Sequence, residues 1–164
     1  MKRTRGTAAV LGTVAGALVL SGCGAEDLPL VAVERDAHGG YTAVLRPCGD
    51  DLIQGLALVG APAGTESERN YSGWRVPGKR HGTDAEFPLF TPPSAWRARA
   101  TGPQRLVPDY MYQLVFGKAE FNYEYSGVVT FTARNLSALE PGQVWADDKA
   151  MSLGEFEKLA EDSC

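Results

Sequence analysis

The sequence is poor in the residues that most often carry chemistry, with two histidines and three cysteines among 164 residues. It lacks the CxxC pairs of many zinc sites and the GxSxG, HExxH and SxxK motifs of common hydrolases. A phosphate-binding glycine loop is also missing. We therefore predict no catalytic residue, no metal ligand and no cofactor, within the limits of known motifs.

Basic residues are in deficit as well, with 16 lysines and arginines against 20 aspartates and glutamates. Lys2, Arg3 and Arg5 lie at the very start, so the chain beyond them has 13 basic residues against the same 20 acidic ones. Nucleic-acid binding needs clustered basic side chains to displace phosphate counterions. The only local concentration of them is at residues 75–81, so we expect no nucleic-acid partner.

The amino terminus has the organisation of a secretory signal. The positive residues are followed by an uncharged stretch, residues 7–20, which is short for a membrane span of about 20 apolar residues. The stretch ends in Leu20, Ser21, Gly22 and Cys23. This tetrapeptide resembles the lipobox of bacterial lipoproteins, in which a cysteine follows two small residues and a leucine.

The resemblance implies a diacylglycerol thioether on Cys23 and cleavage after Gly22. Two acyl chains anchor a protein stably, because each buried CH₂ contributes about 0.8 kcal/mol. We therefore expect a lipid-anchored protein on the extracytoplasmic face of the cell membrane, with membrane lipid as a partner through Cys23. The alternative is that residues 6–25 remain as a transmembrane anchor, which would put the domain on the same side.

With Cys23 assigned to lipid, two cysteines remain, and an exported domain meets oxidising conditions. We predict a disulfide between Cys48 and Cys164, which closes a 116-residue loop. The chain-entropy relation gives about 4 to 5 kcal/mol for such a loop. A reactive or metal-binding thiol is the competing interpretation, but no histidine lies near either cysteine in the sequence.

Length and composition favour one domain behind the leader. Residues 1–22 form the expected signal peptide, residues 23–27 a short tether, and residues 28–164 a single β-rich domain. Ten prolines and nineteen glycines favour many turns. We expect a mainly β fold, an antiparallel β-sandwich or curled sheet, with an immunoglobulin-like arrangement as one option.

The sequence pattern predicts short strands in the first half of this domain. Residues 28–35 and 41–48 have strand propensity and are separated by Asp36 and a pair of glycines, which is typical of a hairpin. Residues 51–59 predict another strand. Residues 65–85 are polar and predict a long loop with one short strand around Trp74. Strands are then predicted at residues 86–90 and 96–100.

The second half contains the clearest alternation. Tyr110, Tyr112, Leu114 and Phe116 share one predicted face, with Gly117 and Lys118 as the expected turn and Gly127 as a bulge. The apolar residues predicted to share the face of the next strand are Phe121, Tyr123, Tyr125, Val129, Phe131 and Ala133.

One short helix is expected at the carboxyl terminus. Ser152 and Glu155 have the spacing of a capping box, and Phe156, Leu159 and Ala160 then fall on one helical face. If this face packs on a sheet, the predicted disulfide holds the helix there.

Candidate binding residues gather in the polar loop. Tyr71 and Trp74, together with Trp96, could form an aromatic platform for a sugar or peptide. The cationic cluster that could receive a phosphate or carboxylate comprises Arg75, Lys79, Arg80 and His81. Core packing of the tryptophans and a solvated charged loop are the plain alternatives. The adjacent carboxylates Asp50-Asp51 and Asp147-Asp148 are expected in turns or caps.

The leading functional prediction is a non-catalytic envelope module that binds a protein, glycan or small ligand. A second hypothesis is an envelope hydrolase or transferase that uses a carboxylate with His38 or His81. A third is a structural subunit of a membrane complex, which would expose a large apolar patch.

Overall fold

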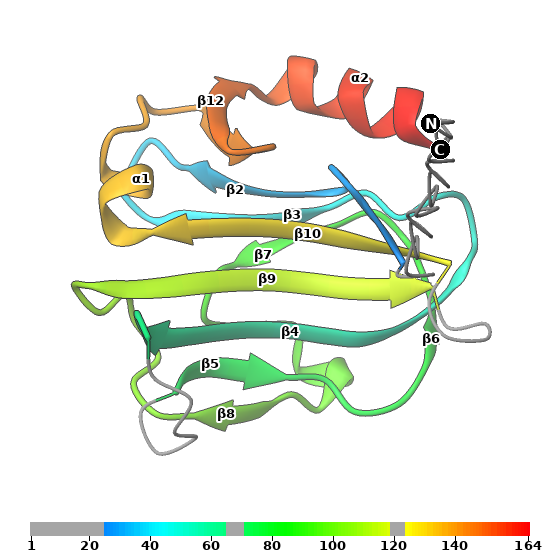
Figure 1. The fold of residues 1–164 in the computed structure, drawn as a ribbon, viewed down its shortest axis with the longest axis horizontal. Helices are drawn as coiled ribbons and strands as arrows, with labels where there is room; N and C mark the ends of the chain where they lie inside the picture. The colour runs from blue at the N-terminus through cyan, green and yellow to red at the C-terminus, as the bar shows by residue number, and fades with distance from the viewer. Residues whose placement is uncertain (1–24, 65–70, 119–123) are drawn as a thin grey trace, which may run out of the picture.

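Alternating apolar and polar side chains build two packed β-sheets in the computed structural model, which describes residues 25–64, 71–118 and 124–164 (Figure 1). The expected signal peptide, Cys23, Phe121 and Tyr123 lie outside the described residues. Within the described ranges, no helix combines the length and apolarity that a membrane crossing requires.

The large sheet has the strand order β1-β10-β9-β4-β5-β8, with β6 beside β4, and the small sheet has the order β12-β11-β2-β3-β7. The large sheet comprises β1 (Glu26–Leu28), β4 (Leu52–Pro62), β5 (Ser72–Arg75), β6 (Arg80–His81), β8 (Arg99–Thr101), β9 (Tyr110–Lys118) and β10 (Tyr125–Thr132). The small sheet comprises β2 (Val31–Arg35), β3 (Tyr41–Leu45), β7 (Ala85–Pro88), β11 (Gln143–Ala146) and β12 (Lys149–Ser152).

The predicted antiparallel β-sandwich is confirmed, and among the described strands the one parallel pairing joins β1 to β10. Part of the predicted tether therefore belongs to the sheet, because Glu26 and Asp27 are already in β1. In β2 and β3, buried residues follow one another without alternation. Both faces of these two strands are therefore covered.

The core lies between the sheets and uses the predicted faces of β9 and β10. Tyr112, Leu114 and Phe116 are buried on β9, and Phe131 on β10 stacks on Tyr112 with ring centroids 5.6 Å apart. Burying such a side chain stabilises the fold by about 1.5 to 3 kcal/mol. The Tyr112 hydroxyl accepts a hydrogen bond from the Val107 backbone N–H at 2.8 Å, so its polar atom is also satisfied.

The predicted hairpin between β2 and β3 is confirmed. An Asp36 carboxylate oxygen accepts hydrogen bonds from the backbone N–H groups of Gly40 and His38, which closes the turn. These hydrogen bonds hold the pKa of Asp36 below its usual value. Gly39 takes a φ of +82°, which its missing side chain permits.

The short strand predicted around Trp74 is confirmed as β5, but the rest of residues 71–85 is not the predicted loop throughout, because it also contributes β6 and leads directly into β7. The predicted strand at residues 96–100 is also partly wrong. A 3₁₀ helix, Ser94–Trp96, comes first, and Arg97 then takes a φ of +52°, so the strand begins only at Arg99.

Gly117 and Lys118 do not form the predicted turn, because β9 continues through both of them. Gly127 is not a bulge either, since it pairs regularly with Phe116. A Cβ atom there would lie 2.7 Å from the Phe116 ring, so the glycine provides room for the core. The irregular register lies in β4, where Gly55 takes a φ of +68°.

Three elements that the sequence did not predict follow β10, namely a short helix and the strands β11 and β12. Helix α1 (Ala133–Ser137) begins where Ala133 was expected to continue the strand, and the Thr132 hydroxyl accepts a hydrogen bond from the Asn135 backbone N–H. Asp147 and Asp148, with φ of +48° and +57°, form the tight turn between β11 and β12.

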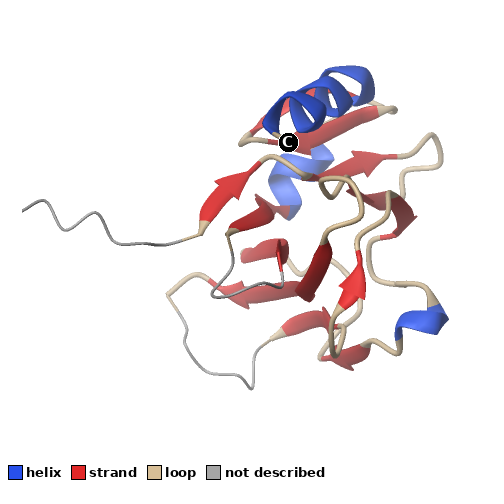
Figure 2. Ribbon diagram, turned by 90° about the vertical axis from the view of Figure 1, so that its right-hand side faces the viewer, coloured by secondary structure: helices blue, strands red, loops and turns tan. Residues whose placement is uncertain are grey.

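The predicted carboxyl-terminal helix is confirmed as α2 (Leu153–Ser163), which begins at the Ser152–Glu155 capping box. It packs beside β11 and β12 with Phe156 and Ala160 buried (Figures 1 and 2). The predicted Cys48–Cys164 disulfide is present, with Cα atoms 5.4 Å apart. It fastens the end of the helix to the segment after β3.

Candidate functional site

The predicted aromatic platform is not formed, because Trp74 belongs to the core. Its side chain is 2% exposed, and its indole N–H donates a 2.8 Å hydrogen bond to the Leu89 carbonyl. It also meets Phe87 edge to face, with ring centroids 5.7 Å apart. Tyr71 is half-buried at the start of β5. Neither residue provides an open ring surface for a sugar.

The predicted cationic cluster is also divided by the fold. The Arg80 guanidinium lies over the Trp96 ring, 4.7 Å from its centroid, and burial lowers the pKa of Arg80. Lys79 and His81 are exposed near β6, whereas Arg75 points away from the core on β5. Of the six predicted binding residues, Arg75 lies beside the surface that we consider the candidate site.

That surface is the exposed side of the large sheet. On its three central strands, every side chain directed away from the core is uncharged, although the solvent side of an antiparallel sheet ordinarily carries charges. We define the outer face as these residues: Ala57, Val59 and Ala61 of β4, Met111, Gln113 and Val115 of β9, and Ser126, Val128, Thr130 and Thr132 of β10.

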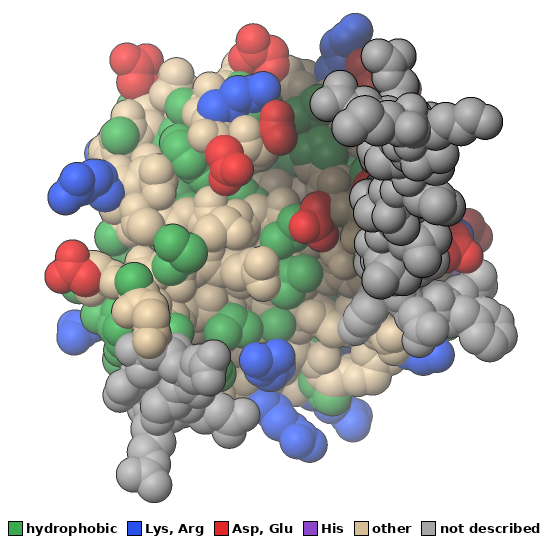
Figure 3. Space-filling model, viewed as in Figure 1, with side chains coloured by type: hydrophobic (Ala, Val, Ile, Leu, Met, Phe, Trp, Pro, Cys, Tyr) green, Lys and Arg blue, Asp and Glu red, His purple; other side chains and the backbone are tan. Residues whose placement is uncertain are grey.

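The outer face is bordered by basic residues on β5 and β8, as the pairing of the strands shows. Val115 is opposite Ala57, Ala57 is opposite Arg75, and Arg75 is opposite Arg99 on the edge strand β8. Figure 3 shows uncharged side chains over the middle of the sheet and basic side chains along its lower margin. One row of cross-strand neighbours thus runs from valine to two adjacent arginines.

The two arginines line a groove of about 440 Å³, which we call the arginine groove. Both are exposed, and neither has an ion pair with a residue in the described part of the chain. The remaining lining residues are Gly55, Leu56, Ala57, Val76, Pro77 and Thr101. The groove therefore combines two open cations with a largely apolar floor.

An acidic groove of about 240 Å³ borders the opposite side of the outer face. Asp27, Asp147 and Asp148 lie around it, and Gln113 and Thr130 extend into it from the outer face. The uncharged surface therefore separates a basic margin from an acidic one. Opposite potentials on two sides of one surface orient a charged ligand that lies across it.

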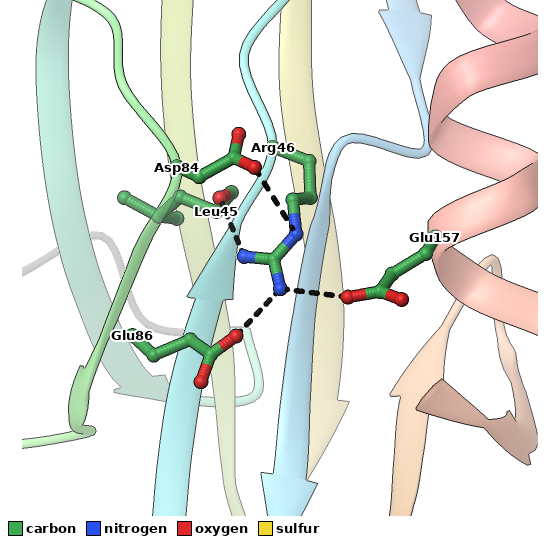
Figure 4. A network of polar contacts seen from close by, with 5 residues as sticks. All are labelled: Leu45, Arg46, Asp84, Glu86 and Glu157. Atoms are coloured by element: carbon green, nitrogen blue, oxygen red, sulfur yellow. Dashed lines mark hydrogen bonds and ion pairs between the residues drawn. The ribbon is translucent and has the colours of Figure 1, made fainter. Parts of the chain in front are cut away.

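Arg46 is the contrasting case, since it is fully engaged in a structural network (Figure 4). Its guanidinium pairs with Glu86 and, at 3.0 Å, with Glu157 of α2, and Asp84 lies 3.8 Å away. Although burial alone would lower the pKa of Arg46, the hydrogen bonds that its guanidinium donates to Glu86 and Glu157 raise that pKa. This arginine joins α2 to the sheet edge and is not available to a ligand.

The histidines do not converge with carboxylates in a cleft. His38 and His81 are exposed, and neither lines the main grooves of the described residues. His81 has its Nδ1 atom 3.2 Å from the Asp50 carbonyl oxygen, and Asp51 accepts a hydrogen bond from Tyr125. Across the described ranges, no group of three or more histidine, cysteine or acidic side chains is arranged to hold a metal ion.

Sequence analysis missed Arg99 and the neutral surface beside it. The alternation at residues 96–100 predicted a strand that contains Arg99, but the strand that pairs with it was unknown. Only the pairing of β5 with β8 brings Arg99 opposite Arg75. Comparison with known protein families, curated proteins and solved structures finds no match to this chain.

Proposed function

We propose that this protein is a non-catalytic binding module, anchored by lipid on Cys23 to the extracytoplasmic face of the cell membrane. The outer face is its ligand surface. The observation that carries the binding role is an open, uncharged sheet surface that ends in two arginines without ion-pair partners in the described chain. The Leu20–Cys23 tetrapeptide, with its resemblance to the lipobox, supports the anchor.

Two features favour this role over the other hypotheses. A hydrolase or transferase would need His38 or His81 beside a carboxylate in a cleft, and neither lines the main grooves of the described residues. A structural subunit would expose a broad apolar patch. Among the described residues, Met111, at 52% exposure, is the one exposed large hydrophobic side chain.

The anchor is tested by the intact mass of the protein extracted from membranes. We expect a chain that begins at Cys23 and carries two or more acyl groups, and we expect Cys23→Ser to remain unmodified. A natural product that begins at Met1, or one without fatty acid, would contradict the anchor.

The ligand surface is tested by a photocrosslinking amino acid placed at Gln113 in intact cells. Gln113 is exposed in the middle of the outer face, and Lys158, exposed on α2, is the matched control position. We expect a light-dependent product from position 113 that is absent from position 158. Equal yields at the two positions would contradict the outer face as the ligand surface.

A further inference from the structure

We infer that the arginine groove is an oxyanion site, in which Arg75 and Arg99 bind the carboxylate or phosphate group of a ligand with an adjoining apolar part. This inference rests on the proposed binding function and assigns the chemistry of one end of the ligand.

Two like charges lie directly opposite each other at the margin of the large sheet. Arg75 and Arg99 are register partners across β5 and β8, and both line the same groove. Like charges directly opposite each other destabilise a sheet. No carboxylate is among the residues that line this groove, so the repulsion has no local compensation there. An anion placed between the two guanidinium groups would supply it.

The guanidinium group is well suited to bind an oxyanion. Its planar set of N–H donors matches the two oxygens of a carboxylate or phosphate, and such charge-assisted hydrogen bonds are about twice as strong as neutral ones. Thr101 adds a hydroxyl group to the same groove. The groove is therefore lined by two guanidinium groups and a hydroxyl, which are donors that suit an oxyanion.

The floor of the groove is apolar, unlike the two arginines at its side. Leu56 and Val76 form the buried floor beside the two cations, Pro77 is exposed there, and the volume of about 440 Å³ suits a small molecule or the end of a chain. A ligand that carries only charge would leave this surface unused. Ala57, which is 2% exposed, lies between the groove and the outer face, because it lines the groove and is opposite both Arg75 and Val115.

Three other arginines of this region lack these features. Arg80 is engaged with Trp96, and Arg97 and Arg105 do not line the arginine groove. The register pair is therefore the specific element of the proposal, and each of its members can be changed separately.

The test uses fluorine NMR with the full chain in nanodiscs of neutral phosphatidylcholine. The probes are 4-fluorobenzoate, 4-fluorophenyl phosphate and the uncharged analogue 4-fluorobenzamide. Because hydrogen bonds to charged groups contribute about 1.5 to 3 kcal/mol, we expect at least one anionic probe to bind about tenfold more tightly than the amide. Whichever of 4-fluorobenzoate and 4-fluorophenyl phosphate binds with the higher affinity identifies the oxyanion that the groove prefers.

Variants assign the effect to the groove. Arg75→Gln and Arg99→Gln should each weaken binding of the anion by about tenfold. Arg134→Gln removes the same charge from an exposed position on α1 and should leave binding unchanged. The inference is overturned if the amide binds as tightly as both anions, or if Arg134→Gln acts as strongly as Arg75→Gln. Crosslinking from position 113 would still report on the outer face in that case, so failure of the site and failure of the proposed function are distinguishable.

Discussion

The protein uses arginine in two opposite ways at two places in the sandwich. Beside α2, the Arg46 side chain is 14% exposed and contacts three carboxylates. On the margin of the large sheet, Arg75 and Arg99 are exposed, face each other and contact no carboxylate of the described residues. The first arrangement joins elements of the fold, whereas the second leaves its charge available to a ligand.

The region around α2 is held at both of its ends. The Ser152 capping box fixes its start, the Arg46 network holds its middle, and the disulfide fixes its end. Among the described residues, the β5–β8 margin has no capping box, ion-pair network or disulfide. Its outer strand, β8, is a three-residue edge strand whose residues are all exposed. Substitutions should therefore affect stability in the first region and ligand binding in the second.

The largest expected effect comes from removing the disulfide. Cys48→Ser with Cys164→Ser should lower the free energy of unfolding by about 4 kcal/mol, because the closed loop spans 116 residues. Urea unfolding of the oxidised protein and the double variant measures the difference. A loss below about 1 kcal/mol would show that the bond does not restrict the unfolded chain as this relation requires.

Arg46→Ala should have the next largest effect, lowering the free energy of unfolding by about 2 kcal/mol. This value is below that of a fully buried ion pair because its carboxylate partners are half or more exposed. Arg99→Ala is the comparison and should stay within about 0.5 kcal/mol of the parent. If Arg46→Ala and Arg99→Ala lowered the free energy of unfolding by similar amounts, the two regions would not differ in how they use arginine.

Ser152→Ala should lower the free energy of unfolding by about 1 kcal/mol. The Ser152 hydroxyl accepts the Glu155 backbone N–H at 3.2 Å, and the alanine variant leaves that donor without its cap. Ser152→Thr keeps the hydroxyl and serves as the control. An unchanged melting temperature in the alanine variant would contradict this start of α2.

Tyr125 makes stability depend on pH in the alkaline range. Burial and the hydrogen bond to Asp51 raise its pKa from 10.0 to about 12. Because the pKa of Tyr125 is higher in the folded protein than in the unfolded chain, its protonated hydroxyl stabilises the fold. This stabilisation is present below pH 10 and is lost as pH rises towards 12. The free energy of unfolding, measured between pH 10 and pH 12, should fall as pH rises, and Tyr125→Phe should make this fall less steep. An identical slope in the variant would contradict the assignment to Tyr125.

Local patterns in the sequence predicted the features that depend on neighbouring residues. The β2–β3 turn follows from Asp36 and its glycines, and the start of α2 follows from Ser152 and Glu155, because each interaction spans four residues or fewer. The disulfide followed from elimination among three cysteines. These predictions needed no knowledge of how the strands pair.

The site depended on pairing between distant segments, which local patterns do not specify. Trp74 is buried because Leu89 supplies a carbonyl to its indole, and Arg75 becomes half of a pair only when β8 adopts its register. The β11–β12 hairpin was missed because its strands are only four residues long. Its turn is made by the adjacent aspartates that were expected in a turn or cap.

The most direct test of the account measures stability and anion binding on the same Arg75→Gln sample. Removing one of two opposed cations should raise the free energy of unfolding by a few tenths of a kcal/mol, or leave it unchanged. Affinity for the preferred anionic probe should fall about tenfold in the same sample. A clear loss of stability with unchanged affinity would make Arg75 a structural residue and would contradict the central claim.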